Sequence, residues 1–350
     1  MTNVQFQIGN HTVSAASPVY VIAEGCDNHL GNLQTAKEMC VQAKLAGANA
    51  IKFQHHLPDE EMLPEVPLSS NFNMPLYEFL KKHALTLDQH RELMAHCRAI
   101  GIQYLCTPFS YKAAEEMISI GLELIKIGSG EMTDLPSLRK MATNLRRPMI
   151  VSTGMCTLEE IDRTYQTLVS TGVPFALMNC VSEYPPVYED VNLRVIETMQ
   201  RRYPKAVIGH SDHTPDLYTC FAAVTLGAKI LEKHVILDKR QPGPDQSVSI
   251  DFRDLAALVD GVRKVEAALG DEKKVHGQEK QIRQWAFRSL VTTRAVRQGE
   301  VLCDEMIWSK RPGTGIPSHW RDRIIGRRAV RDISSNAQLA WEDVDGEPLT

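Results

Sequence analysis

Eight short apolar runs of this chain each end in polar or charged residues, and helix-length segments separate the runs. Strands that alternate with helices predict a parallel sheet, and eight such units predict a sheet closed into a barrel. In a barrel of this kind the active site lies at the C-terminal ends of the strands. The polar residues that end the eight runs are Glu24, Lys52, Gln54, Thr107, Lys126, Ser129, Glu131, Ser152, Ser182, Tyr184, Ser211, His213 and His234.

The chain of 350 residues is longer than one such barrel, which takes about 250 residues. The strand and helix pattern, with a short β extension before it, reaches to about residue 270, and a charged segment with helical character follows. From Phe287 onward the runs are short, β-like and broken by Gly and Pro. We therefore predict a barrel domain over residues 1–270, a linker over 271–286 and a small β-rich domain over 287–350.

The composition argues against several classes of partner. A net charge of -4 without a clustered basic stretch predicts no nucleic-acid binding. Apolar runs stay well below the roughly 20 residues that span a bilayer, and the N-terminus does not resemble a signal peptide, so we expect no membrane association. Eight scattered cysteines without a C-x-x-C pair predict reduced thiols and a cytoplasmic location. Cys26 is interpreted here as a small apolar filler.

Two lysines predict an anion site. Lys52 and Lys126 end strands two apart around the barrel, with Thr107 on the strand between them and Ser129 and Ser152 nearby. Two ammonium groups beside hydroxyls suit a phosphate with an adjacent carboxylate. A single lysine at a strand end often extends into solvent, but two lysines flanked by hydroxyl residues favour anion binding.

A histidine pair predicts a metal site. His213 and His234 end neighbouring strands, so their imidazoles can share one divalent cation, with oxygen ligands in the remaining positions. This mixed ligation suits Mn²⁺ best, with Mg²⁺ and Zn²⁺ as alternatives. Glu24, Glu131 and Asp245 also face the rim, where each carboxylate forms an ion pair with a lysine or transfers protons.

Several motifs point to a known family. The stretches are IAEGCDNHLG, GANAIKFQ, CTPF, IKIGSGE, VSTGM, CVSEYPPVYEDVNLRVI, GHSDHT, GAKILEKHVILD, PGPD, RSLV and SKRPGTGI. Together they cover residues 18–345 and resemble the N-acetylneuraminate (sialic acid) synthase family. The resemblance implies a (β/α)8 TIM barrel followed by a small antifreeze-like SAF domain of the β-clip type. It also implies a transferase of carbohydrate biosynthesis, of the lipopolysaccharide or capsule kind. Such an enzyme condenses phosphoenolpyruvate with an open-chain N-acetylated hexose such as N-acetylmannosamine, giving a nine-carbon α-keto acid and phosphate by C–O cleavage.

The resemblance also implies roles for particular residues. His213 and His234 would hold the metal that polarises the aldehyde, and Glu24 or Glu131 would move protons. Arg311, in the small domain, would reach the sugar in the partner subunit of a domain-swapped homodimer. Phosphoenolpyruvate would be held by Lys52, Lys126, Thr107, Ser129, Ser152, Ser182 and Ser211, and the sugar by Gln54, Tyr184, Asp245 and Phe287.

One motif departs from the family pattern. The family reads E-I-G-x-N-H-N-G after the first barrel strand, whereas here Leu30 precedes the final glycine. Because that segment lies over the sugar, the sugar stays open between N-acetylmannosamine and the diacetamido hexoses of legionaminic and pseudaminic acid synthesis. Two other classes also stay open: a catalytically silent carbohydrate-binding barrel with a SAF module, and a retro-aldol lyase that forms a Schiff base through lysine.

Overall fold

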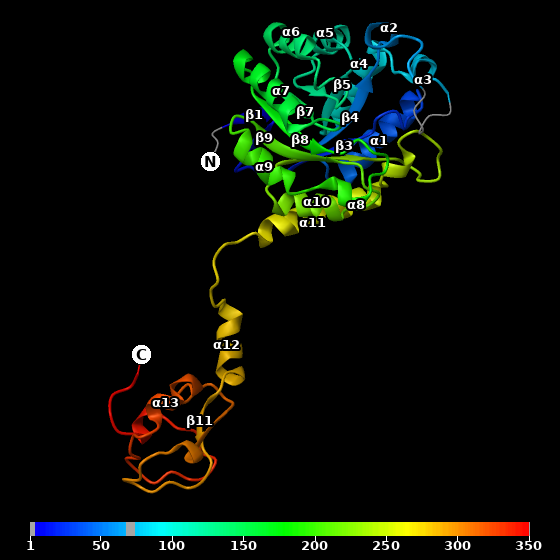
Figure 1. Ribbon diagram of the computed structural model, residues 1–350. Coiled ribbons are helices and arrows are strands. Elements are labelled where there is room, and N and C mark those ends of the chain that lie inside the picture. The colour runs from blue at the N-terminus through cyan, green and yellow to red at the C-terminus, as the bar shows by residue number, and fades with distance from the viewer. Residues whose placement is uncertain (1–3, 68–73, 350) are drawn as a thin grey trace. The chain divides into compact units, whose positions relative to one another are not determined.

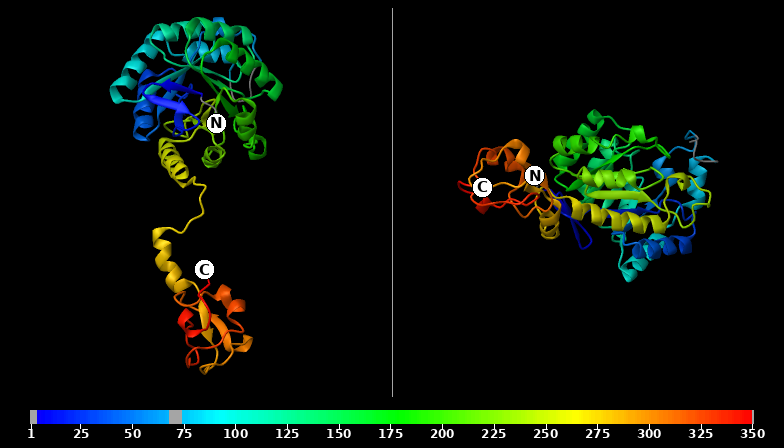
Figure 2. Two further views of the ribbon diagram at one scale, coloured as in Figure 1. Left: turned by 90° about the vertical axis from the view of Figure 1, so that its left-hand side faces the viewer. Right: turned by 90° about the horizontal axis from the view of Figure 1, so that it is seen from below.

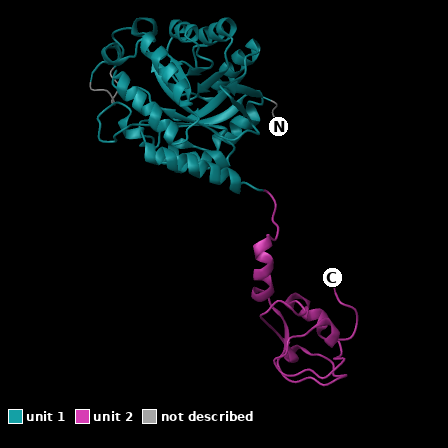
Figure 3. Ribbon diagram, turned by 180° about the vertical axis from the view of Figure 1, so that it is seen from behind, with its two compact units in different colours: residues 1–270 teal, residues 271–350 magenta. Residues whose placement is uncertain are grey.

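The computed structural model describes residues 4–67 and 74–349, and the chain divides into two compact units, Met1–Gly270 and Asp271–Thr350 (Figure 3). The segment 271–286, which we expected as a helical linker, is grouped with the second unit. Residues 271–276 have no regular structure, and helix α12 spans Gly277–Ala286. The helix begins there because the backbone N–H of His276 donates to the Glu279 carboxylate at 2.8 Å, which caps the first turn.

The first unit is built around eight parallel strands (Figure 1). They are β3 Tyr20–Glu24, β4 Ala50–His55, β5 Gln103–Pro108, β6 Ile125–Ile127, β7 Met149–Ser152, β8 Phe175–Cys180, β9 Val207–Asp212 and β10 Ile230–His234. Hydrogen bonds join them in the order β5-β4-β3-β10-β9-β8-β7-β6. The two end strands, β5 and β6, contact each other, so the sheet closes almost completely. The predicted barrel is confirmed.

Helices form an outer layer around the strands (Figure 2). They are α1 Leu33–Leu45, α2 Pro58–Glu61, α3 Leu76–His83, α4 Leu87–Ile100, α5 Tyr111–Ser119, α6 Leu135–Leu145, α7 Leu158–Thr171, α8 Tyr188–Val191, α9 Val195–Arg202, α10 Tyr218–Thr225 and α11 Phe252–Ala268. Local sequence sets their ends: α4 begins with a capping box between Thr86 and Gln89 and stops at Gly101, whose φ is 75°. None of the helices that the structure describes is long and apolar enough to span a bilayer.

The residues between β4 and α4 are rich in Pro, Glu and Asn, which predicts an irregular loop, yet part of this segment is helical. It contains the short helix α2 and the amphipathic helix α3, whose Tyr77, Phe79 and Leu80 are buried. Residues 68–73 of this segment lie outside the described part of the chain. Prolines and acidic residues in and around these two short helices give the segment the composition of a loop.

Two apolar layers leave the C-terminal half of the barrel free for polar groups. One core lies between the strands and the helices. The other fills the barrel's N-terminal half, where Ile22, Leu105 and Ile150 point inward. An N-terminal hairpin, β1 Gln5–Ile8 with β2 His11–Ser14, adds Phe6, Ile8 and Val13 to that inner core. The hairpin therefore closes the end of the barrel opposite the polar rim.

The second unit has a core of its own. It contains the antiparallel pair β11 Ser289–Thr292 and β12 Ile307–Lys310, the short helix α13 Arg321–Ile324, and several isolated β-bridges. The core residues include Leu290, Ile307 and Ile316. A small, β-rich unit is thus present where the sequence predicts one.

A buried ion pair lies behind the rim of the first unit. Lys233 is fully buried, and its Nζ lies 2.5 Å from the carboxylate of Asp212, which is 1 % exposed. The hydroxyls of Thr214 and Thr219 donate to the same carboxylate at 2.8 and 2.9 Å. Burial opposes ionisation of Asp212, but the imidazole of His210, 3.4 Å away, and the charge of Lys233 lower the carboxyl pKa well below its ordinary value. Because side chains alternate along strands, this pair faces away from His213 and His234.

We expect Asp212→Ala to destabilise the first unit by about 3–5 kcal/mol, because it leaves the ammonium of Lys233 buried without an opposite charge, bonded only to the Thr214 carbonyl among the described residues. The measurement is urea denaturation followed by circular dichroism. The matched control is Asp260→Ala, which breaks the exposed Lys264–Asp260 pair and should cost about 0.5 kcal/mol or less. Equal losses in both variants would contradict the prediction.

Candidate active site

The register of the parallel strands brings polar strand ends together inside the barrel. Glu24 on β3 is the partner of Lys52 on β4 and of His234 on β10. Ser211 on β9 is the partner of Glu232 on β10. All five side chains are at most 5 % exposed. A folding chain accepts such burial of charge only where opposite charges and hydrogen bonds compensate it.

Four of these groups form a charged cluster, which comprises Glu24, Lys52, Lys126 and Glu232. Lys52 is ion-paired with Glu24, and the Nζ atoms of Lys52 and Lys126 each lie 3.7 Å from a different carboxylate oxygen of Glu232. One carboxylate is therefore shared between the two lysines. Glu232 was absent from the site predicted from the sequence, although its spacing from His234 places both on one strand face.

Hydroxyl groups surround the charged cluster. Lys52 donates to Thr107 at 2.9 Å, Lys126 donates to Ser152 at 2.7 Å, and Ser211 donates to Glu232 at 3.1 Å. These contacts bring five of the seven residues expected to hold phosphoenolpyruvate into one network with Glu232.

The two remaining hydroxyls meet at a glycine. Ser129 accepts a hydrogen bond from the backbone N–H of Gly154 at 3.0 Å. A Cβ atom at Gly154 would lie 2.2 Å from the Ser182 Oγ and 2.8 Å from the Ser129 Oγ. Only glycine therefore lets both hydroxyls approach this turn.

Burial and neighbouring charges shift the pKa values of the four cluster residues in different directions. Burial raises the pKa of Glu24 to about 7, although Lys52 opposes the shift. Burial also disfavours the charged form of Glu232, but Lys126 and Lys52 lower its pKa below the ordinary value. Burial lowers the pKa of Lys126, whereas the carboxylates Glu232 and Glu24 outweigh burial and raise that of Lys52. The raised pKa of Glu24 weakens its negative charge beside the two amines near neutral pH, which favours an anionic ligand.

Glu131 occupies a separate position at the rim. Burial raises its pKa to about 6, and its Oε2 has no hydrogen-bond partner among the described residues. Together with Glu61, Phe109 and Tyr111, it lines a cavity of about 860 Å³. Among the described residues, the lining of this cavity includes neither Lys52 nor Lys126. Glu131 therefore lies in a different part of the rim from Glu24, and the two carboxylates are not equivalent candidates for proton transfer.

Gln54 links the charged cluster to a second polar group. Its Nε2 donates to Glu24 at 3.3 Å, and its Oε1 accepts from Nε2 of His56 at 2.9 Å. The other ring nitrogen of His56 lies 3.0 Å from Glu61. His56 is 6 % exposed and was not among the predicted site residues. In the sequence, the one sign that His56 belongs to the site is its position next to His55, directly after a strand.

The two histidines lie side by side but have different surroundings. Their ring centroids are 5.0 Å apart. Nδ1 of His213 donates to the Val181 carbonyl at 2.6 Å, and the ring of Tyr184 stacks on that of His213 at 4.5 Å. Burial opposes the charge on His213, yet Cys180 raises the pKa to about 9. His213 is therefore already engaged with neighbouring protein groups.

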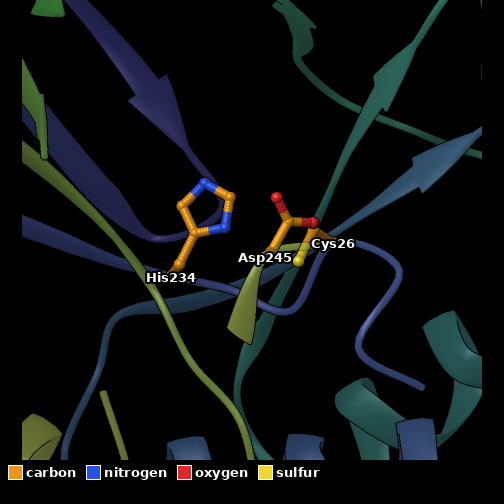
Figure 4. Close-up of side chains that lie close together, drawn as sticks. All are labelled: Cys26, His234 and Asp245. Atoms are coloured by element: carbon orange, nitrogen blue, oxygen red, sulfur yellow. The ribbon is translucent and has the colours of Figure 1, made fainter. Parts of the chain in front are cut away.

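His234 has free ligand capacity instead. It is 5 % exposed, and its Nδ1 has no hydrogen-bond partner in the described part of the chain. The thiol of Cys26 and the carboxylate of Asp245 lie nearby, with ligand atoms within 4.8 Å of one another (Figure 4). This set of nitrogen, sulfur and oxygen donors fits a divalent cation. Asp245, which we expected to hold the sugar, thus lies beside His234, and Cys26 lies among polar groups.

The two remaining predicted residues belong to the second unit. Arg311 follows β12, and its guanidinium lies 5.6 Å from the ring centroid of Trp285 on α12. Phe287 follows α12 directly, and the guanidinium of Arg283 lies 4.8 Å from its ring centroid. Trp285 and Phe287 are more than half exposed. Arg311 therefore lies beside the exposed ring of Trp285, and Trp285 together with Phe287, two residues further along the chain, gives this unit an exposed aromatic surface.

Comparison with known proteins places this geometry in a family. The NeuB family model matches residues 39–274, and the SAF domain model matches residues 287–345. The chain is 35% identical to N,N'-diacetyllegionaminic acid synthase of Legionella pneumophila subsp. pneumophila, over 93% of this chain and 94% of that protein. It is 33% identical to human N-acetylneuraminate-9-phosphate synthase, over 95% and 94%. The solved structure of the Bacillus subtilis spore coat polysaccharide biosynthesis protein SpsE superposes with a TM-score of 0.67 at 32% identity, over 98% of this chain and 100% of that one. The chain belongs to the NeuB family and carries a C-terminal SAF domain.

Proposed function

We propose that this protein is a nonulosonic acid synthase that condenses phosphoenolpyruvate with an open-chain N-acetylated hexose. The products are a nine-carbon α-keto acid and phosphate. The observation that carries the proposal is the pair of buried lysines, Lys52 and Lys126, which share Glu232 and are surrounded by hydroxyls. The names of the relatives support the same reaction class.

The charged cluster and its neighbours supply the positive charge and the hydrogen-bond donors that phosphoenolpyruvate requires. Lys52 and Lys126 neutralise its phosphate and carboxylate, and the hydroxyls and backbone N–H groups of the rim orient it. When the methylene carbon attacks the sugar aldehyde, positive charge develops on the neighbouring carbon. Water then adds to that carbon, and the tetrahedral intermediate loses phosphate by breaking the C–O bond. Ionised Glu232 lies between the two lysines, where it limits the positive charge before substrate binds.

The sugar half of the site is formed by the groups around Gln54, Tyr184 and the histidines. A bound divalent cation supplies Lewis-acid polarisation of the aldehyde, with His234 and His213 as its proposed imidazole ligands and Mn²⁺ as the ion that the sequence favours. The sugar is N-acetylmannosamine or a diacetamido hexose. Relatives named for legionaminic, pseudaminic and N-acetylneuraminate-9-phosphate synthesis are 32% to 35% identical, which does not separate these substrates. The cytoplasmic location expected from the cysteines stays a prediction.

One observation favours a second reaction class. Burial lowers the pKa of Lys126, as a Schiff-base lyase would require. However, its Nζ already donates to Ser152 and to the backbone carbonyl of Ile127, at 2.7 and 3.0 Å. A lyase of this kind releases no phosphate from phosphoenolpyruvate, so phosphate release separates the two classes.

We expect phosphate release from phosphoenolpyruvate in the presence of a divalent metal and at least one N-acetylated hexose. Lys126→Met should lower kcat/KM by about ten- to a hundred-fold, because a hydrogen bond to a charged group contributes about 1.5–3 kcal/mol. Lys44→Met, which removes a surface lysine bonded to the Gly101 carbonyl, is the control and should keep full activity. If the wild-type protein releases no phosphate with any sugar, the carbohydrate-binding alternative replaces this proposal.

Glu24 is proposed to accept a proton from the attacking water, which requires its ionised form. Because its pKa is raised to about 7, kcat/KM should rise with pH as the carboxyl ionises and level off above that region. The measurement is a pH profile of phosphate release. Glu24→Gln should lower the rate and remove this inflection, whereas Glu131→Gln should retain it. An unchanged profile in Glu24→Gln would assign the proton transfer to another group.

The exposed aromatic surface beside Arg311 supports a homodimer with exchanged SAF domains. Exposed aromatic groups around an arginine are typical of contact surfaces. In the proposed dimer, Arg311 and Phe287 of one chain complete the sugar site of the other. An arginine is suited to this role because its fork binds sugar oxygens or a carboxylate.

Subunit mixing tests this arrangement. Lys52→Ala and Arg311→Ala should each be nearly inactive alone, yet co-folded mixtures should regain up to about a quarter of wild-type activity, because mixed two-fold dimers contain one intact composite site. The measurement is phosphate release after refolding the two variants together, with mixed dimers verified by two affinity tags. Inactive mixed dimers would mean that Arg311 serves its own chain or no site.

A further inference from the structure

Three donor groups of different chemistry converge beside the histidine pair. Cys26 follows β3, His234 ends β10, and Asp245 precedes the short 3-10 helix Gln246–Val248. One ligand atom from each residue lies within 4.8 Å of the others. Figure 4 shows a ring nitrogen of His234 turned toward the carboxylate of Asp245, with the sulfur of Cys26 next to that carboxylate. Segments more than two hundred residues apart thus meet at one point.

The imidazole of His234 indicates that this point holds a ligand. His234 is 5 % exposed, so its ring is shielded from water, and Nδ1 has no hydrogen-bond partner in the described part of the chain. Buried polar atoms are paired in most proteins, and an unpaired one requires a specific explanation. A cation between His234, Cys26 and Asp245 gives Nδ1 its missing partner.

The backbone at Cys26 is held in an unfavourable conformation. Its φ is 38°, in the left-handed region that favours glycine, yet this chain has a cysteine whose side chain is fully buried. A non-glycine residue in this conformation persists where the surrounding structure holds it, and such residues are concentrated at functional sites. The thiol therefore has a role beyond filling space.

The Cys26 thiol is well placed to bind together with Asp245, because the sulfur and a carboxylate oxygen of Asp245 lie within 4.8 Å of each other. A divalent cation displaces the thiol proton and binds the thiolate, so metal binding at this point releases a proton. Serine keeps a hydroxyl beside Asp245 but does not replace a thiolate ligand. The variant Cys26→Ser therefore separates hydrogen bonding from metal ligation.

We propose that Cys26 is a direct metal ligand and completes a thiolate, imidazole and carboxylate site with His234 and Asp245. Three protein ligands leave a coordination position open, as in catalytic zinc sites. A thiolate ligand shifts selectivity toward Zn²⁺, Co²⁺ or Fe²⁺ and away from Mg²⁺. This ligand set revises the Mn²⁺ preference, the sugar-binding role expected for Asp245 and the role of His213 as a second imidazole ligand, since Nδ1 of His213 is already bonded to the Val181 carbonyl. The inference deepens the proposed function, since the open position would face the aldehyde, but metal binding itself is measurable without turnover.

Cobalt binding tests the inference directly. The full-length protein is stripped with a chelator and titrated with Co²⁺, and the wild type should develop a thiolate-to-cobalt charge-transfer band in the near ultraviolet. Cys26→Ser and Cys26→Gly should lose that band. Cys303→Ser, which removes a thiol in the second unit, should retain it. Asp245→Asn should weaken Co²⁺ binding by at least about ten-fold, because losing only a residue that supports a metal ligand already costs that much.

Two further measurements separate direct ligation from a structural role. Competition between Zn²⁺ and Mn²⁺ should show that Cys26→Ser loses Zn²⁺ affinity far more than Mn²⁺ affinity, whereas a folding defect would weaken both equally. Calorimetry in buffers of different ionisation enthalpy should show about one more proton released by the wild type than by Cys26→Ser. A wild-type cobalt complex without the thiolate band, or a band that persists in Cys26→Ser, overturns the inference. Absence of phosphate release in a protein that shows the band would overturn the synthase proposal alone.

Discussion

The charged cluster at the centre of the barrel is the constraint on which the rest of the site depends. A charge buried without an opposite partner costs several kcal/mol, so Lys52 and Lys126 are tolerable only beside Glu24 and Glu232. These four residues come from β4, β6, β3 and β10. Lys126 lies on an end strand of the sheet order, and it reaches Glu232 only because the sheet closes. The anion site therefore depends on closure of the barrel.

Each strand has an apolar N-terminal half and a polar C-terminal half on its inner face, and this separation limits the free-energy cost of the buried charges. The N-terminal halves of the strands point apolar side chains inward, and the terminal hairpin covers them. The C-terminal halves point charged groups inward, and their neighbours on the opposite face are either apolar or paired, as Asp212 and Lys233 are. Rigid strands thus carry the groups that require fixed distances. The loops carry Cys26, Tyr184 and Asp245, which surround the sugar half of the proposed site.

The two units contribute in different ways. The second unit has its own core around Leu290 and Ile316, so it holds its shape independently of the barrel's core. It nevertheless leaves Trp285 and Phe287 more than half exposed beside Arg311. Aromatic groups bury a large area when they are covered by a partner. The shared active site proposed above accounts for both the exposed aromatic surface and Arg311, since both would contact the partner subunit.

The local sequence determined the elements and the faces of this protein, whereas the tertiary structure decided which side chains meet. Strand periodicity predicted the eight strands and put Lys52, Ser211 and His234 on the inner face, and Thr86 and Gly101 marked the ends of α4. These features depend on a few neighbouring residues. The sharing of Glu232 by two lysines and the meeting of Cys26 with His234 and Asp245 depend on loop paths and barrel closure. Distances between segments far apart in the chain are set by packing, which periodicity does not encode.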